Sequence, residues 1–382
     1  MVSGPLEGVR VLELASIGPG PFCAMVLADL GADVVRVERP NAVAPHSDPP
    51  PDALQRGRSA SIGVNLKEPE GVEIVLQLAE RSDVLVEGFR PGVMERLGLG
   101  PEVCHGRNPG LVYGRMTGWG QSGDRALTAG HDIDYLAVAG ALHHIGDPDR
   151  PPAVPLNLIA DFGGGGMLLA LGIVAALFAR GSDAAAGEVI DAAMVDGSAL
   201  LTSMFHGMVA TGMWSEERGV NLLDGGAPFY RSYETADGRY VAVGALEPQF
   251  YAALLDGLAI ESGDLPAQYD RSGWPHIRER FGEVFRTRTR DEWVETFAGT
   301  DACVAPVNTF SEAVADTATS GRSSFVDVGG VVQPAPAPRF AGRAATAPAV
   351  ARAPGADTDA VVAGLGFREA DLRDLRARGV IA

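Results

Sequence analysis

The chain has 382 residues, more than one ordinary hydrophobic core organises, so we expect two domains. Hydrophobic residues make up 46% and charged residues 21%, the composition of a soluble globular protein. A net charge of −18 excludes a broad surface for nucleic acid or anionic membranes. It still permits a small anionic ligand held by local arginines.

The cellular setting follows from three negative features. The three cysteines are widely spaced and form neither a disulfide framework nor a zinc pattern, which suits a reducing compartment. The first residues lack the features of a signal peptide. The longest apolar run, residues 167–179, is too short to span a bilayer. We therefore expect a cytoplasmic protein without membrane insertion.

The first half of the chain alternates strands and helices. A β-rich run ends in a Gly-Pro turn, a helical pattern follows, and a second β-rich run comes directly after it, which makes a βαβ unit. This alternation predicts a Rossmann-like, doubly wound α/β sheet. The expected strands are 9–15, 32–38, 83–87 and 111–116, and the expected helices are 22–30 and 69–81.

The pattern changes after about residue 225. A hairpin over 229–243, a helix over 248–256, a helix over 282–297 and a short strand over 303–307 indicate a smaller α+β domain. A proline-rich stretch starts at 333, and two short helices end the chain. We place the large domain at 1–200, completed by 330–382, and the small domain at 225–320, with linkers at 200–225 and 320–330.

Two features of the first hundred residues bear on whether the protein binds a phosphate-bearing ligand. The turn Gly18–Pro21 with Glu38 resembles a dinucleotide fingerprint, but its prolines remove N–H groups that a pyrophosphate needs, so a tight strand-to-helix turn is favoured. Basic residues follow several expected strands, where arginine forks match phosphate oxygens. They are Arg39, Arg56, Arg58, Lys67, Arg90 and Arg96. The alternative is a set of scattered surface arginines.

His131 and Asp161 carry the clearest chemical signal. Imidazole and carboxylate are suited to moving protons near neutral pH. His131 lies in an acidic loop, and Asp161 precedes four glycines and an apolar helix. We expect the glycines to admit a substrate to the N–H groups at the helix start, where an enolate would be stabilised. The alternatives are a structural histidine and an N-cap aspartate.

Glu247 follows the hairpin of the small domain. It is interpreted either as an acid at a helix start or as a carboxylate that holds a histidine across a domain cleft. The sequence does not choose between these two roles.

The sequence resembles the class III CoA-transferase superfamily, and within it the α-methylacyl-CoA racemase branch, over nearly its whole length. The motifs that carry the resemblance include Gly31-Ala32-Asp33, Glu87-Gly88-Phe89-Arg90-Pro91-Gly92, Gly130-His131-Asp132 and Asp161-Phe162-Gly163. Others are residues 8–14, 116–121, 191–197, 240–250 and 354–380.

The resemblance implies an intertwined homodimer in which each subunit has a Rossmann-like large domain and a small domain. It implies that the ligand is coenzyme A, carried as part of the substrate, with no metal and no other cofactor. The positions that match CoA contacts in the family are Arg39, Val64, Asn65, Leu66, Gly88, Phe89, Arg90, Arg96, Gly130, Asp132, Ile133, Asp134 and Tyr135.

His131 decides the branch. In the transferases the aspartate matching Asp161 is a nucleophile, whereas in the racemases it and the histidine matching His131 are two acid/base groups, and Glu247 matches the carboxylate that pairs with the histidine. The resemblance therefore implies a racemase of 2-methyl-branched acyl-CoA thioesters in fatty acid metabolism. The alternatives are a class III CoA-transferase and a non-catalytic CoA-ester-binding protein. The acyl group is expected near Ile17, Leu222, Leu223 and Tyr230.

Overall fold

The computed structural model describes residues 4–43, 52–181, 187–319, 321–343 and 347–382. The chain forms two compact units. The first contains the chain up to Ala139, together with Leu156–Leu201 and Gly321–Ala382; the second contains Gly140–Pro155 and Thr202–Ser320.

Two stretches belong to a different unit from the one that the expected domain boundaries give them. Residues 140–155 fall inside the expected large domain and 202–225 inside an expected linker, yet both belong to the second unit. Arg218 joins the two stretches, since its guanidinium donates to the backbone oxygens of His143 (2.8 Å), Asp147 (2.9 Å) and Arg150 (2.6 Å). One side chain thus binds the two stretches to each other.

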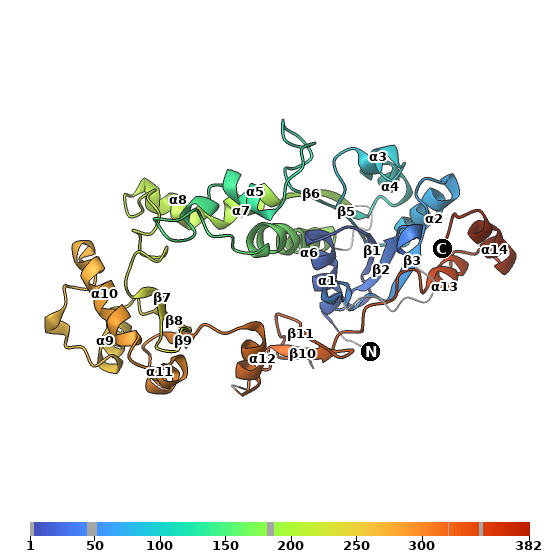
Figure 1. The fold of residues 1–382 in the computed structure, drawn as a ribbon. Helices are drawn as coiled ribbons and strands as arrows, with labels where there is room; N and C mark the ends of the chain where they lie inside the picture. Colours follow the sequence, from blue (N-terminus) through green and yellow to red (C-terminus); the bar gives the residue numbers. More distant parts are fainter. Residues whose placement is uncertain (1–3, 44–51, 182–186, 320, 344–346) are drawn as a thin grey trace. The chain divides into compact units, whose positions relative to one another are not determined.

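Six parallel strands form the sheet of the first unit, in the order β3-β2-β1-β4-β5-β6 (Figure 1). This is the doubly wound order, and the strand sequence reverses between β1 and β4. The predicted Rossmann-like sheet is confirmed, and two strands not singled out from the sequence, β3 and β6, form its edges. The strands are β1 (Arg10–Leu14), β2 (Asp33–Glu38), β3 (Ala60–Gly63), β4 (Val84–Glu87), β5 (Val112–Thr117) and β6 (Glu188–Ala193).

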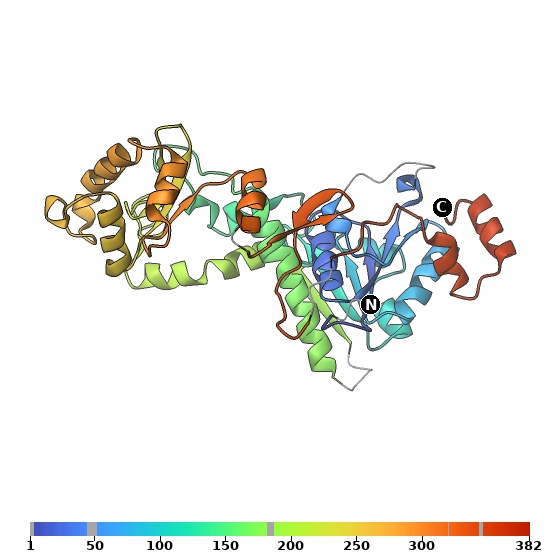
Figure 2. The same ribbon diagram turned by 90° about the horizontal axis from the view of Figure 1, so that it is seen from below.

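Helices cover both faces of this sheet (Figures 1 and 2). Tyr113 of β5 belongs to one apolar cluster with α2 (Pro69–Glu80), α4 (Pro101–Arg107) and the late helices α13 (Thr358–Ala363) and α14 (Glu369–Ala377). Because strand side chains alternate, the next residue faces the other side, where α6 (Leu168–Arg180) packs. Helix α1 (Pro19–Asp29) lies against α6.

Helix α1 starts earlier than predicted. Its first residue is Pro19, so the Gly-Pro turn is the first helical turn, whereas the apolar pattern suggested a start at Phe22. A proline at the first position suits a helix because its missing N–H would have no intrahelical acceptor.

A chain of buried charges joins three strands of the sheet. The Glu13 carboxylate of β1 is fully buried, and it pairs with Arg36 of β2 and with Arg58 before β3, whose Nε lies 3.0 Å from Glu13 Oε2. Arg36 also pairs with Glu38 at 2.5 Å, and Arg58 donates to the Pro21 oxygen at 2.8 Å. Arg58 was a candidate phosphate ligand, and this burial overturns that expectation. Arg56 is likewise buried and paired with Asp29 at 2.5 Å.

Glu13→Gln is expected to lower the free energy of unfolding by about 3 kcal/mol or more, because it leaves two buried guanidiniums without their shared carboxylate. Urea unfolding followed by circular dichroism measures this. The matched control is Glu369→Gln, which removes an exposed pair with Arg373 and should cost less than about 1 kcal/mol. Equal losses in the two variants would contradict a structural role for the buried charges.

The second unit has a three-stranded antiparallel sheet and an aromatic core. The predicted hairpin consists of β7 (Tyr230–Glu234) and β8 (Tyr240–Gly244), and β9 (Val304–Pro306) pairs with β8. Helix α9 (Pro248–Gly257) follows the hairpin. The predicted helix 282–297 is instead two helices, α10 (Trp274–Phe285) and α11 (Arg290–Phe297), because Thr289 and Glu292 form a capping box that starts α11.

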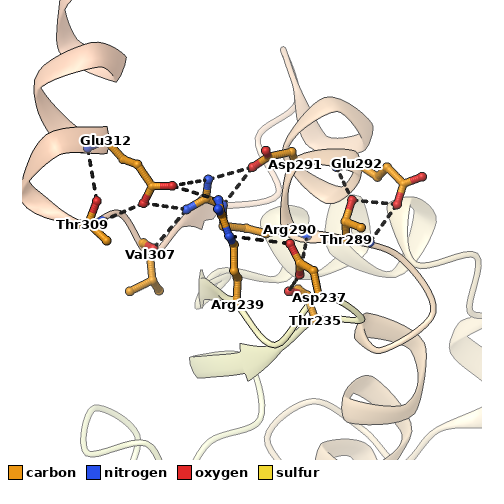
Figure 3. Close-up of polar contacts among 10 residues, drawn as sticks. All are labelled: Thr235, Asp237, Arg239, Thr289, Arg290, Asp291, Glu292, Val307, Thr309 and Glu312. Carbon is orange, nitrogen blue, oxygen red and sulfur yellow. Dashed lines mark hydrogen bonds and ion pairs between the residues drawn. The ribbon is translucent and has the colours of Figure 1, made fainter.

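Arg290 connects α11 to α12 (Phe310–Thr319), as Figure 3 shows. Its two terminal nitrogens lie 3.1 and 3.0 Å from the two oxygens of Glu312, and Arg239 donates to the same carboxylate at 2.8 Å. The hydrogen bonds from Arg290, and those from the backbone and side chain of Thr309, hold the pKa of Glu312 at about 2. The bidentate pair fixes the start of α12 against the hairpin and α11.

Candidate active site

A cavity of about 460 Å³ lies in the first unit, next to the carboxyl ends of β1, β4 and β5. The crevice beside the β1/β4 reversal is where ligands bind in open α/β sheets. Both predicted proton carriers line it, together with the predicted CoA contacts Gly88–Arg90, Gly130 and Tyr135. The remaining wall comes from Ile17–Pro19, Pro91, Met116–Trp119, Ala126, Thr128, Ala129, Asn157 and Met194.

Asp161 lies on a π-helix, Leu158–Met167, which continues into α6. Asn157 donates from Nδ2 to Asp161 Oδ2 at 3.1 Å. Burial raises the pKa of the Asp161 carboxyl; the Asn157 hydrogen bond lowers it, the charge of Asp132 raises it and His131 lowers it. Gly18, with φ of +66°, faces the carboxylate, because a Cβ on Gly18 would lie 3.4 Å from Oδ2.

The glycine run has a different role from the one expected. A Cβ on Gly164 would lie 2.8 Å from the backbone of Gly197 in α7 (Met194–Leu201), and one on Gly166 would lie 2.7 Å from the Pro19 oxygen of α1. One on Gly165 would lie 2.9 Å from the Met194 side chain. Neighbouring helices, and not a substrate, occupy the space of the missing side chains.

Two further expectations about this helix are wrong. Asp161 is not its N-cap, because the helix begins three residues earlier at Leu158. The helix also extends beyond the apolar run 167–179 that was expected to form it: Leu158–Arg180 is a helix of 23 residues, long and apolar enough by length and composition to cross a membrane. Its buried face packs on the sheet, as Leu169 and Ile173 do against β5.

His131 is the N-cap of α5 (Asp132–Val138) and is exposed. Its backbone N–H donates to Asp134 Oδ2 at 2.9 Å, so the Asp134 carboxylate, an expected CoA contact, holds the histidine loop. The Tyr135 hydroxyl donates to the Gly130 oxygen at 2.5 Å. Burial raises the pKa of Tyr135 to about 12, so it stays a hydrogen-bond donor at neutral pH.

The buried carboxylate of Glu87 holds the segment Gly88–Arg90. Glu87 Oε2 accepts the N–H of Phe89 at 2.7 Å, and its other oxygen lies 3.0 Å from Nε of Arg115. Burial raises the pKa of Glu87 to about 7. Arg90 itself is exposed at the cavity and available to a phosphate.

Several predicted CoA contacts lie outside the cavity lining. Arg39, Arg96 and Ile133 are exposed, and Asp132 is buried. Val64, Asn65 and Leu66 meet other parts of the first unit: Val64 bridges to Ile381, the Asn65 N–H donates to the Val380 oxygen at 2.8 Å, and Leu66 packs on the core. Glu247 lies in the second unit, as the exposed N-cap of α9.

The expected acyl contacts are placed in both units. Ile17 lines the cavity, whereas Leu222, Leu223 and Tyr230 belong to the second unit. Sequence reasoning missed Asn157, Gly18 and Trp119 as cavity residues. Trp119 stands in the quoted motif 116–121, and Gly18 in the turn read as a poor fingerprint, so both carried a signal; Asn157 carried none.

No group of three His, Cys, Asp or Glu side chains is placed to hold a metal ion among the residues that the structure describes.

Comparison with known proteins places the chain in a family. The family described as CoA-transferase family III matches residues 6–359. The chain belongs to this family. It is 47% identical over 379 residues to the alpha-methylacyl-CoA racemase of Mus musculus, with 98% of this chain and 97% of that protein covered. The Homo sapiens protein of the same name is 46% identical over 379 residues, with the same coverage.

A solved structure is similar throughout. The crystal structure of a CAIB/BAIF family protein from Brucella suis superposes with a TM-score of 0.79 at 26% identity, over 95% of this chain and 99% of that one. The described fold is therefore the family fold.

Gly197→Ala is expected to lower the free energy of unfolding by about 1–3 kcal/mol, because its Cβ would meet the Gly164 oxygen at 1.9 Å and force two helices of this family III site apart. Thermal or urea unfolding measures this. Gly207→Ala on α8 (Ser203–Ala210) is the control, since nothing lies within 4 Å of its Cβ and helix propensity favours alanine. An unchanged free energy of unfolding in the Gly197 variant would show that the two helices can accommodate a methyl group between them.

Proposed function

We propose that the protein interconverts the (2R) and (2S) forms of 2-methyl-branched acyl-CoA thioesters. The observation that carries the proposal is that His131 and Asp161 line one cavity at the switch point of the sheet. The nearly full-length likeness to two proteins named alpha-methylacyl-CoA racemase supports it further.

The proposed mechanism uses both groups on the α-carbon. One of His131 and Asp161 removes the α-proton, and the other protonates the planar enolate on its opposite face. A proton carrier works best when its pKa is near the operating pH. Imidazole is the side chain that enzymes use most often for such proton transfer. The raised pKa of the Asp161 carboxyl lies closer to neutral pH than the pKa of an ordinary aspartate.

Of two expectations from the sequence, we keep the role of Glu247 and withdraw the role of the N–H groups near Asp161. Glu247 remains our proposed partner of the catalytic histidine in the dimer; its side chain makes no capping hydrogen bond with α9, so this carboxylate is available. The backbone N–H groups of Ala160 and Asp161 both donate to Asp132, at 2.7 and 2.8 Å. They are therefore not donors to the enolate oxygen, contrary to the expectation from the sequence.

Coenzyme A is proposed to bind along the carboxyl edge of the sheet. The backbone of Gly88–Arg90 and Gly130 borders the cavity, and the exposed cations Arg39, Arg90 and Arg96 supply charge for phosphates. Val64–Leu66, Ile133 and Tyr135 complete the proposed contacts. The reaction moves a proton and changes no oxidation state, so it needs no redox cofactor. We propose that the enzyme uses no metal and no cofactor beyond the CoA of its substrate.

We also propose a cytoplasmic homodimer. Met167, Leu171 and Phe178 form an apolar stripe on the solvent side of the helix Leu158–Arg180, with Leu171 63% and Phe178 87% exposed. A second copy of the chain is the proposed cover for this stripe. All three cysteines are free, and Cys303 is exposed, which suits a reducing compartment.

The first test uses one enantiomer of a 2-methylacyl-CoA in deuterated water without added carboxylic acid. We expect deuterium at C2 together with the opposite epimer. Asp161→Asn and His131→Ala should each lower turnover by about 10²–10⁴-fold, with CoA binding largely retained.

Near-wild-type racemisation by either variant would refute the assignment of that residue. Absence of exchange, with acyl-CoA formed once a carboxylic acid is added, would make Asp161 a nucleophile and the protein a CoA-transferase, as other members of the family are named. Tight CoA-ester binding with neither reaction would leave a binding protein.

The dimer is tested by replacing Leu171 and Phe178 together with Asp. Each buried side chain contributes about 1.5–3 kcal/mol to association, so the double variant should dissociate at least about 100-fold more readily. Sedimentation velocity measures the species present. Val103→Asp on α4, on the other face of the sheet, is the control for an exposed apolar replacement. A monomeric wild type would refute the proposal, and a fully dimeric double variant would refute the stripe as its interface.

A further inference from the structure

Asp132 is connected to both proposed proton carriers, to His131 by a peptide bond and to the Asp161 backbone by a hydrogen bond. It follows His131 in the chain and begins α5. Its side chain points into the protein, where it is only 5% exposed, and its Oδ2 accepts the N–H groups of Ala160 (2.7 Å) and Asp161 (2.8 Å). The carboxylate is therefore committed to the backbone that carries Asp161.

Its position is costly for a residue without a function there. The second oxygen, Oδ1, is buried without a hydrogen-bond partner among the described residues. A buried polar atom left unpaired costs about 1–3 kcal/mol. A neutral acceptor, such as an asparagine or serine, would cap the same N–H groups without burying a charge next to another carboxylate.

We propose that Asp132 is a positioning residue that couples the two acid/base groups. The peptide bond to His131 and the two hydrogen bonds to Ala160 and Asp161 form one rigid link between the histidine loop and the π-helix. Movement of either element is thereby transmitted to the other, and the gap that the substrate α-carbon must occupy is held constant. This inference rests on the proposed racemase activity.

The link also satisfies backbone N–H groups near the start of the π-helix. The first N–H groups of any helix lack intrahelical acceptors. A carboxylate that accepts two of them makes charge-assisted hydrogen bonds, which are stronger than neutral ones. The anchor is thus strongest at the residues that aim Asp161 at the cavity.

Asp132 also acts on Asp161 through its charge. The groups that face the Asp161 carboxyl are His131, Asp132, the Asn157 amide and Tyr135, and Arg90 lines the same cavity. Of these, Asp132 adds a like charge, which disfavours the ionised form of Asp161. Removing that charge alone should move the titration of Asp161 to lower pH.

The experiment compares wild type, Asp132→Asn and Asp132→Ala on both enantiomers of a 2-methylacyl-CoA in deuterated water. It records deuterium incorporation and inversion separately. The asparagine keeps one acceptor oxygen and loses the charge, whereas the alanine loses the link.

Asp132→Ala should slow inversion by about 100-fold, because a displacement of about 1 Å in a reacting group has that effect. The loss should be asymmetric. The enantiomer that His131 deprotonates should still exchange its proton, so its ratio of exchange to inversion rises by about tenfold. Asp132→Asn should retain more activity than Asp132→Ala. The part of its pH–rate profile that depends on ionised Asp161 should shift to lower pH. KM should change less than kcat in both variants.

A purely structural role makes a different prediction. Asp357→Asn is the matched control, because Asp357 caps the Ser61 N–H at 3.0 Å in the same unit without lining the cavity. It should lower stability and leave the exchange-to-inversion ratio unchanged. If the Asp132 variants behave likewise, losing both enantiomers in proportion at an unshifted pH profile, the coupling is refuted. If wild type itself neither exchanges nor inverts, the proposed function fails first, which is a separate outcome.

Discussion

The close approach of three helices at the glycine run is the constraint on which the site depends. Gly164 lies against Gly197, and Gly166 lies against Pro19, at distances that exclude any side chain. Backbone atoms of α1 and α7 approach the glycines closely, so α1, α7 and the π-helix pack tightly against one another beside the cavity. Interiors packed at this density transmit small displacements instead of absorbing them. The position of Asp161 is consequently set by atoms on other helices.

Buried charge is the second organising feature. The protein is strongly acidic, yet it places several arginines in its interior, where each pairs with a carboxylate or with backbone oxygens. Replacing such pairs with apolar residues is often neutral in stability. Here the buried pairs fix the positions of particular segments. Glu13 joins β1 to β2 and to Arg58, which precedes β3, and Glu87 holds the Gly88–Arg90 segment at the cavity. Arg39, Arg90 and Arg96, which we propose for the CoA phosphates, are exposed.

Much of the fold was predictable because its signals are local. The alternating strands and helices of the first unit and the 229–243 hairpin follow from periodicity and turn residues. The errors also have local causes. The break between α10 and α11 depends on a capping box that a continuous helical pattern conceals. The edge strands β3 and β6 are short or poorly buried, so their hydrophobic signal is weak.

At the candidate site, the sequence alone predicted His131 and Asp161 as candidate proton carriers, since imidazole and carboxylate are the side-chain types suited to that chemistry. It also determined the family, through motifs distributed along the whole chain. Only the tertiary structure decided what their neighbours do. The glycines serve helix packing, Arg56 and Arg58 serve the core, and Asp132 holds the Asp161 backbone. The reason is physical: these roles depend on partners dozens to hundreds of residues away, and no local pattern specifies which segments fold against one another.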